Sequence, residues 1–209
     1  MNKNQLVSPC CHQCWHRASN PCRQLIACIG EGPLCHKDDQ CRASRADRLA
    51  TARRGGEGDL LFIGTGTCGL ANGASRIMRR IRLYLESAGI PASVIEVGCV
   101  GYCQREVFMD LLRGSAPRLS YCDITPDSID ELLDEIYVRG NLKNRFLLGR
   151  WDDADGSLSE VPLLRDTPFF KRQSKVVLEN CGCIDPASLD AALAMGAFRA
   201  ASRALHAMT

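Results

Sequence analysis

The sequence has no long hydrophobic run, no hydrophobic leader and almost no net charge. It contains no stretch of about 18 consecutive apolar residues, so it predicts no membrane-spanning helix. Residues 1–20 are polar and contain three cysteines, unlike the apolar core of a secretory signal. The net charge of +2 indicates neither a nucleic-acid nor a membrane-surface partner. We therefore expect a cytoplasmic protein without membrane insertion.

Cysteine, by contrast, is abundant. The sequence has 13 cysteines, an odd number, and seven of them lie in the first 41 residues. Disulfides are rare in a reducing compartment, so we interpret these thiols as ligands of metal ions or iron–sulfur clusters. The 209 residues are enough for one ordinary domain or two small ones.

The first unit, residues 1–49, has few large apolar side chains, so burial alone cannot offset the entropy lost in ordering it. Zn²⁺ held by thiolate and imidazole ligands, or a second iron–sulfur cluster, would stabilise it. A disulfide-bonded knot and a loosely ordered thiol-rich segment stay open as alternatives. The candidate ligands are Cys10, Cys11, Cys14, His16, Cys22, Cys28, Cys35, His36 and Cys41. A glycine- and arginine-rich stretch at 53–58 predicts a linker and a domain boundary near residue 55.

The second unit, residues 58–148, alternates apolar runs, glycine loops and one strongly helical pattern. The predicted elements are a strand at 60–63, a helix at 73–87, a strand at 93–97, an antiparallel hairpin of 106–112 with 118–122, and a helix after Thr125. The helix between the first two strands makes them parallel neighbours. This order, β-α-β-β-β-α, predicts a small thioredoxin-like α/β sheet. We expect the arginines on the first helix, at positions 76, 79, 80 and 82, to form a solvated face.

Each of the two parallel strands leads into a loop that carries both glycine and cysteine. Glycine suits positions where the backbone bends sharply and passes close to a bulky group. The motifs are Gly64-Thr65-Gly66-Thr67-Cys68-Gly69 and Gly98-Cys99-Val100-Gly101-Tyr102-Cys103, followed later by Ser120-Tyr121-Cys122-Asp123-Ile124-Thr125-Pro126. They resemble the thioredoxin-like [2Fe-2S] ferredoxin domain fused to NADH-binding flavin subunits of respiratory complex I relatives, NAD-linked hydrogenases and formate dehydrogenases.

The resemblance implies that Cys68, Cys99 and Cys103 bind a [2Fe-2S] cluster, which needs four ligands. In the better known members of that family a further cysteine lies five positions before the first matched one, where this chain has Ile63. Cys122 ends a strand that returns to the same end of the predicted sheet, so we name it as the candidate fourth ligand. A domain without a cluster, kept as a docking scaffold, stays open as the alternative.

Residues 149–167 show no clear periodicity and predict a connector. After it come Phe169-Phe170-Lys171-Arg172-Gln173 and Asn180-Cys181-Gly182-Cys183-Ile184-Asp185-Pro186, with a strand expected at 176–178 and helices at 186–194 and 197–207. Residues 168–209 thus resemble the opening of the NADH- and FMN-binding subunit itself. We interpret Cys181 and Cys183 as residues that pack in a turn.

The motifs together predict the electron-transfer and assembly portion of an NADH dehydrogenase- or diaphorase-type oxidoreductase. In the family, the loop that binds FMN and NADH phosphates lies beyond the position of Thr209, so we expect no FMN or NADH site and no catalysis by this chain alone. The expected partners are flavin-binding and other redox subunits. A zinc-stapled thioredoxin-like adaptor is the alternative. A thiol–disulfide oxidoreductase is disfavoured, because Cys68 is followed by Gly-Leu-Ala and not by a Cys-x-x-Cys partner.

Overall fold

The computed structural model describes residues 58–151, 156, 158–201 and 204. The chain divides into two compact units, one of residues Gly56–Pro186 and one of Met1–Gly55 with Ala187–Thr209. The nine predicted N-terminal Cys and His ligands lie outside the described residues. Within the described part of the chain, no helix is long and apolar enough to cross a bilayer.

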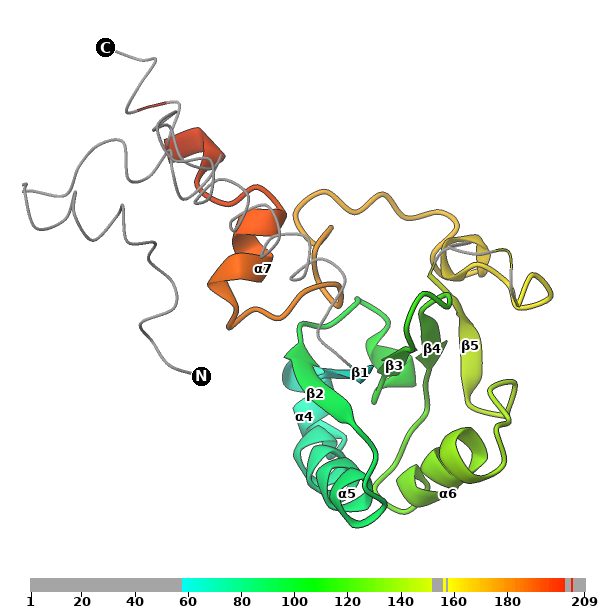
Figure 1. The fold of residues 1–209 in the computed structure, drawn as a ribbon. Coiled ribbons are helices and arrows are strands. Elements are labelled where there is room, and N and C mark those ends of the chain that lie inside the picture. The colour runs from blue at the N-terminus through cyan, green and yellow to red at the C-terminus, as the bar shows by residue number, and fades with distance from the viewer. Residues whose placement is uncertain (1–57, 152–155, 157, 202–203, 205–209) are drawn as a thin grey trace, which may run out of the picture. The chain divides into compact units, whose positions relative to one another are not determined.

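The unit Gly56–Pro186 is built on one mixed five-stranded sheet of order β2-β1-β3-β4-β5 (Figure 1). Its strands are β1 Asp59–Gly64, β2 Ala92–Val97, β3 Met109–Leu112, β4 Leu119–Tyr121 and β5 Leu147–Arg150. β1 and β2 are parallel, and the other three pairings are antiparallel. The prediction of a mixed α/β sheet with a β3–β4 hairpin is confirmed.

The fifth strand was missed, because 147–150 was assigned partly to the second unit and partly to the connector. β5 is only four residues long and has no alternating apolar pattern, so local sequence does not distinguish it from a loop. It forms because its backbone pairs with the free edge of β4. The loop at 64–73 also contains a short helix, α4 Thr67–Ala71, that the sequence analysis did not predict.

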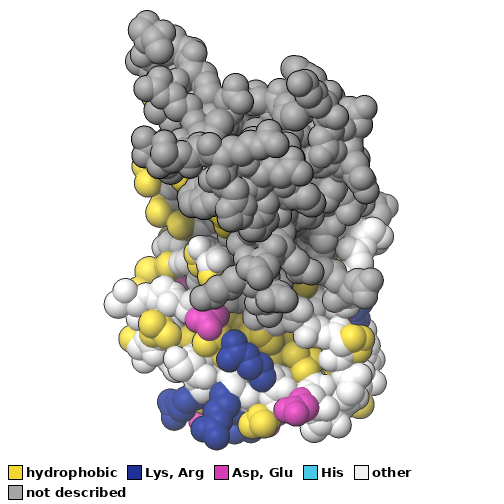
Figure 2. All heavy atoms as spheres, turned by 60° about the vertical axis from the view of Figure 1, so that its left-hand side comes forward, with side chains coloured by type: hydrophobic (Ala, Val, Ile, Leu, Met, Phe, Trp, Pro, Cys, Tyr) yellow, Lys and Arg dark blue, Asp and Glu magenta, His cyan; other side chains and the backbone are white. Residues whose placement is uncertain are grey.

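Helix α5, Ala74–Ser87, joins β1 to β2 and begins after Gly73, as predicted. Its buried side chains recur at helical spacing, at Ile77, Ile81 and Leu85. They pack on Leu61 and Ile63 of β1 in the largest apolar core of the unit. The arginines on its outer face are exposed, which confirms the predicted solvated face. Figure 2, turned to bring forward the side on which α5 lies, shows Lys and Arg side chains gathered beside acidic ones.

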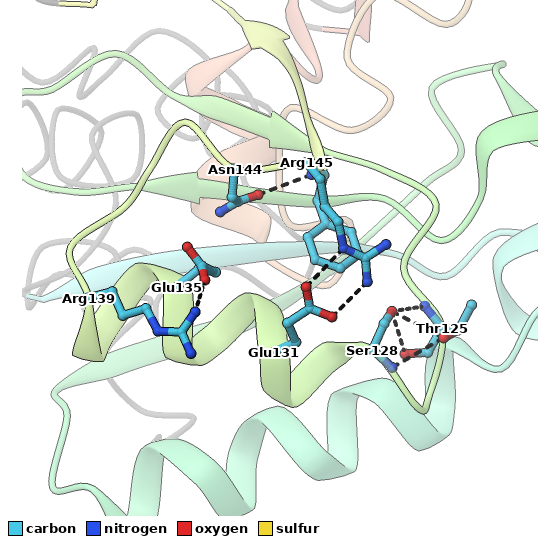
Figure 3. Close-up of polar contacts among 8 residues, drawn as sticks. Thr125, Ser128, Glu131, Glu135, Arg139, Asn144 and Arg145 are labelled. Carbon is cyan, nitrogen blue, oxygen red and sulfur yellow. Dashed lines mark hydrogen bonds and ion pairs between the residues drawn. The ribbon is translucent and has the colours of Figure 1, made fainter.

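Helix α6, Ile129–Leu133, packs on the same face of the sheet as α5 and continues into a π-helical turn at Asp134–Val138. The predicted start after Thr125 is three residues too early, since α6 begins at Ile129 with Ser128 as its N-cap. In the turn ahead of it, Thr125 Oγ1 accepts the Ser128 N–H and Ser128 Oγ accepts the Thr125 N–H (Figure 3). Arg145, at the approach to β5, forms a two-point ion pair with Glu131 of α6.

The opposite face of the sheet carries Phe62 and Val97, and the segment after β5 packs on the same unit through Leu164 and Phe170. A 3-10 helix spans Leu164–Asp166 within the predicted connector. The strand expected at 176–178 is wrong: these residues form turns, and Val177 is 93% exposed. Their apolar character had suggested burial that the fold does not provide.

In the other unit, helix α7 spans Leu189–Ala194. Its N-cap is Ser188, whose hydroxyl accepts the Ala191 N–H at 3.1 Å. The helix predicted at 186–194 therefore begins three residues later than expected, after an oxygen-bearing cap residue. Of the second predicted helix, 197–207, the structure describes 197–201 and 204, and residues 199–201 are helical.

The packing of α5 yields a direct test of the core. Ile77 has no exposed surface, so Ile77→Ala should lower the free energy of unfolding by about 2–5 kcal/mol. Leu83 on the same helix is 56% exposed, and Leu83→Ala should change the free energy of unfolding by less than about 0.5 kcal/mol. Urea denaturation followed by circular dichroism measures both, and equal losses would contradict the assigned inner face.

Candidate metal centre

Three cysteine thiols meet at the carboxyl ends of β1 and β2. Cys68 lies in α4, directly after β1, and Cys99 follows β2. Because the two strands are parallel neighbours, their carboxyl ends reach the same edge of the sheet. Cys103 opens a 3-10 helix at Cys103–Arg105, and its Sγ lies 3.6 Å from the Sγ of Cys99. The Cys68 thiol lies close enough to Cys103 for hydrogen bonding between them to be the first cause that raises the pKa of Cys68.

Glycine allows the two loops to approach each other. A Cβ at Gly66 would lie 2.9 Å from the Cβ of Cys99, closer than two carbon side chains pack. A Cβ at Gly69 would lie 2.1 Å from the carbonyl oxygen of Gly64 at the end of β1. Both positions therefore require glycine for close backbone approach rather than for a special dihedral angle.

Polar groups surround the Cys99 thiol. The Gly101 N–H donates to its Sγ at 3.2 Å, with Gly101 at φ +97°. Burial raises the pKa of the Cys99 thiol to about 11. Glu106, which is 8% exposed, accepts the Phe108 N–H through Oε2 at 3.1 Å. Burial also raises the pKa of the Glu106 carboxyl. N–H donors to sulfur are the kind of contact that tunes a bound iron–sulfur centre.

The distance between the Cys99 and Cys103 sulfurs fits two thiolate ligands on one iron. Two thiolates on one tetrahedral metal, with bonds of about 2.3 Å, lie about 3.8 Å apart, close to the 3.6 Å between Cys99 and Cys103. Within the described residues, no group of three or more His, Cys, Asp or Glu side chains is arranged around a single ion. A [2Fe-2S] cluster takes two protein ligands on each iron. A pair of thiols is therefore enough for one iron of such a cluster, whereas a site for a single ion needs more protein ligands. Cys68 is then available for the second iron.

The predicted fourth ligand, Cys122, lies in a different environment. It is 1% exposed and packs in an apolar cluster with Val100, Phe108, Leu164 and Phe170. Its Sγ accepts a hydrogen bond from Arg105 at 3.1 Å and also contacts Asp123. The structure thus brings Cys68, Cys99 and Cys103 together and places Cys122 in a buried pocket of its own.

A fourth cysteine that the sequence analysis assigned to packing, Cys181, lies beside the β2 loop. Its Sγ is 3.6 Å from the position that a Cβ on Gly98 would occupy. Gly98 directly precedes Cys99, so the thiol reaches the loop that holds two of the three gathered cysteines. Sequence alone did not indicate this approach, because Cys181 and Gly98 are 83 positions apart in the chain.

A buried ion pair anchors the turn that carries Cys181. Arg118 pairs with Asp110 at 2.7 Å, and the two side chains are 10% and 6% exposed. The guanidinium also stacks over the Phe62 ring at 3.7 Å and donates to the carbonyl oxygens of Gly182 and Cys183. The guanidinium is a cation, so these two carbonyl oxygens accept charge-assisted hydrogen bonds. The second Asp110 oxygen is satisfied by Ser120.

No family model matches the chain. Among solved structures it is similar to the thioredoxin-like [2Fe-2S] ferredoxin of Aquifex aeolicus, at 12% identity over 48% of this chain and 98% of the ferredoxin, with a TM-score of 0.39. Two cysteine-to-serine variants of that ferredoxin match at 11% and 12% identity, each over 43% of this chain and 97% of their own, with TM-scores of 0.38 and 0.36. At such identities and scores, the likeness carries no conclusion about what this chain binds.

The anchoring ion pair predicts a large and specific loss of stability. Asp110→Asn leaves the buried Arg118 cation without a counter-charge, so the free energy of unfolding should fall by about 3–5 kcal/mol. Asp130→Asn is the matched control, because Asp130 pairs with Arg80 where both side chains are nearly half exposed. Its effect on the urea midpoint should be close to zero at moderate salt. Equal midpoints for the two variants would contradict the role of Arg118.

Proposed function

We propose that the unit Gly56–Pro186 binds a [2Fe-2S] cluster and serves as an electron-transfer module. The observation that carries this proposal is the convergence of Cys68, Cys99 and Cys103 at the carboxyl ends of β1 and β2, with a 3.6 Å sulfur–sulfur separation in one pair. Cys103 is exposed and the other two thiols are half-buried. A centre at this edge lies near the protein surface, where another redox group has access.

When bound, the cluster supplies one-electron chemistry, and the chain holds and tunes it. Cys99 and Cys103 would ligate one iron, and Cys68 would ligate the other. The Gly101 N–H, already bonded to the Cys99 sulfur, would stabilise negative charge there and so favour the reduced form. The apolar cluster of Val100, Phe108 and Phe170, with Tyr102 packed against it, limits access of water from the protein side of the loop.

The finer assignment, to an NADH-dependent oxidoreductase, extends this proposal. It is supported by the motif resemblance of residues 59–148 and 168–209 to flavin subunits of such enzymes, without a contribution from the fold comparisons. In this assignment the chain passes electrons between a flavin held elsewhere and partner redox subunits in the cytoplasm. The N-terminal Cys and His residues would hold Zn²⁺ or a second iron–sulfur centre.

The first experiment is anaerobic reconstitution of the full chain with iron and sulfide, then metal analysis and low-temperature electron paramagnetic resonance after dithionite reduction. We expect an S = 1/2 signal and at least about two irons per chain. Cys99→Ser should abolish the signal assigned to this unit or shift its g-values, because it replaces a thiolate ligand with a hydroxyl oxygen. Cys183→Ser, which alters a thiol hydrogen-bonded to the Glu179 carbonyl, should leave it unchanged.

Two results would overturn this proposal. Zinc without iron would support the colourless zinc-stapled adaptor instead. An iron signal that survives Cys99→Ser with unchanged shape and intensity would place the iron in another part of the chain.

A further inference from the structure

The three gathered thiols leave one ligand position of a [2Fe-2S] cluster unassigned. At the position where the resembling family has its first cysteine, this chain has Ile63, which is fully buried in the main apolar core. Six cysteines lie among the described residues, and three of them form the gathered site. Within this part of the chain, the fourth thiolate therefore comes from Cys122, Cys181 or Cys183.

Cys122 and Cys183 are engaged elsewhere. Cys122 is enclosed by apolar side chains, and Arg105 and Asp123 contact its sulfur. The Cys183 thiol donates within its own turn, to the carbonyl oxygens of Glu179 and Cys181 at 3.6 and 3.7 Å. Freeing either sulfur requires the loss of packing or of contacts that the fold already makes.

Cys181 is half-buried and lies against the loop that carries the site. The Cys181 Sγ lies 3.6 Å from the place where a Cβ at 98 would stand, an ordinary van der Waals distance, so the thiol is in contact with the loop at Gly98. The next residue, Gly182, packs more closely: with φ +77°, its Cβ would lie 2.5 Å from Cγ1 of Val100. Glycine at 182 thus allows the Cys181 turn to lie against the Gly98–Val100 segment.

Hydrogen bonds from two cationic side chains also hold the Cys181 turn against the loop at Gly98–Val100. Arg118 donates to the carbonyl oxygens of Gly182 and Cys183, the residues that directly follow Cys181. Lys175 donates to the Val100 carbonyl at 2.8 Å, which ties the preceding segment to the same loop. A buried Arg–Asp pair is costly unless its hydrogen bonds are complete, and the two turn carbonyls complete those of Arg118. A segment that only connects two elements at the surface does not need these hydrogen bonds from Arg118 and Lys175.

We propose that Cys181 is the fourth thiolate ligand of the [2Fe-2S] cluster and that Arg118 positions its turn. The inference rests on the proposed function, since it names a ligand of that same site. On ligation the Cys181 thiol would give its proton to solvent, and its thiolate would supply the second protein ligand of the iron that Cys68 would ligate. The site then joins the sheet edge to a segment more than 80 positions later in the chain.

Alanine variants at the three candidate positions, made in the full-length chain, test this proposal. Cys181→Ala should lower cluster occupancy at least about tenfold, the lower end of what loss of even an outer-shell partner costs. Cys122→Ala and Cys183→Ala should keep the wild-type iron and sulfide content, absorption spectrum and paramagnetic signal. Far-UV circular dichroism and urea midpoints confirm that each variant is folded.

A second variant covers the case in which Cys181→Ala does not fold. Cys181→Ser keeps the size of the side chain and offers an oxygen ligand, so it should retain a cluster with shifted absorption and g-values. Arg118→Lys should keep the wild-type spectrum but lose the cluster faster on dilution, because it weakens the hydrogen bonds to the turn carbonyls at 182 and 183 without altering a ligand.

The outcomes separate the two proposals. Loss or shift of the signal in Cys99→Ser together with wild-type spectra in both Cys181 variants overturns the fourth-ligand assignment and leaves the [2Fe-2S] module intact. Loss of the signal in Cys122→Ala with wild-type Cys181→Ala assigns the ligand to Cys122 instead. An unchanged signal in Cys99→Ser overturns the module itself.

Discussion

The parallel pairing of β1 with β2 is the constraint on which the site depends. Leu61 to Ile63 pair in register with Val94 to Glu96, so both strands end at one edge and deliver their loops to the same place. A crossover helix is what permits two consecutive strands to run parallel, and α5 supplies it while burying its apolar stripe on β1. The loops that carry Cys68 and Cys99 lie together because the core of the sheet fixes where the strands end. Packing at Ile77 and the position of Cys99 are thus two results of one topology.

The other face of the sheet contributes through polar contacts. Asp110 and Arg118 stand on adjacent antiparallel strands or their ends, and Trp151 Nε1 donates to Asp110 at 2.8 Å from beyond β5. Arg118 and Ser120 from one segment and Trp151 from another thus converge on this one carboxylate. An apolar pair of the same size would fill the space, but it would offer nothing to the turn carbonyls at 182 and 183. The buried Arg118–Asp110 pair therefore fixes the position of the turn at 182–183, a role that buried ion pairs serve in some proteins.

Much of the sheet was predictable from the sequence, because the strands at 60–63 and 93–97 and the helix at 73–87 have strong local patterns between glycines. The strand at 147–150 was not, since its formation depends on the edge of β4 and not on its own side chains. The same division holds for the site. Cys68, Cys99 and Cys103 were predicted as ligands from their glycine-bearing loops, whereas Cys181 could be placed only by its contact with Gly98 and by the bond from Arg118 to the next residue, Gly182. No local rule reports a contact across 64 residues, the separation of Arg118 and Gly182.

That separation also bears on the order of folding. Closing a long loop costs entropy before its contacts form, and the Arg118 guanidinium that bonds the Gly182 carbonyl is itself held by Asp110 of β3. The strand pairs that receive the turn are closer in sequence and form their contacts over shorter loops. The turn at 180–183 should consequently dock last, on a sheet already assembled. A chain emerging from the ribosome would then display three of its thiols on a folded edge before the residue beside Gly98 arrives.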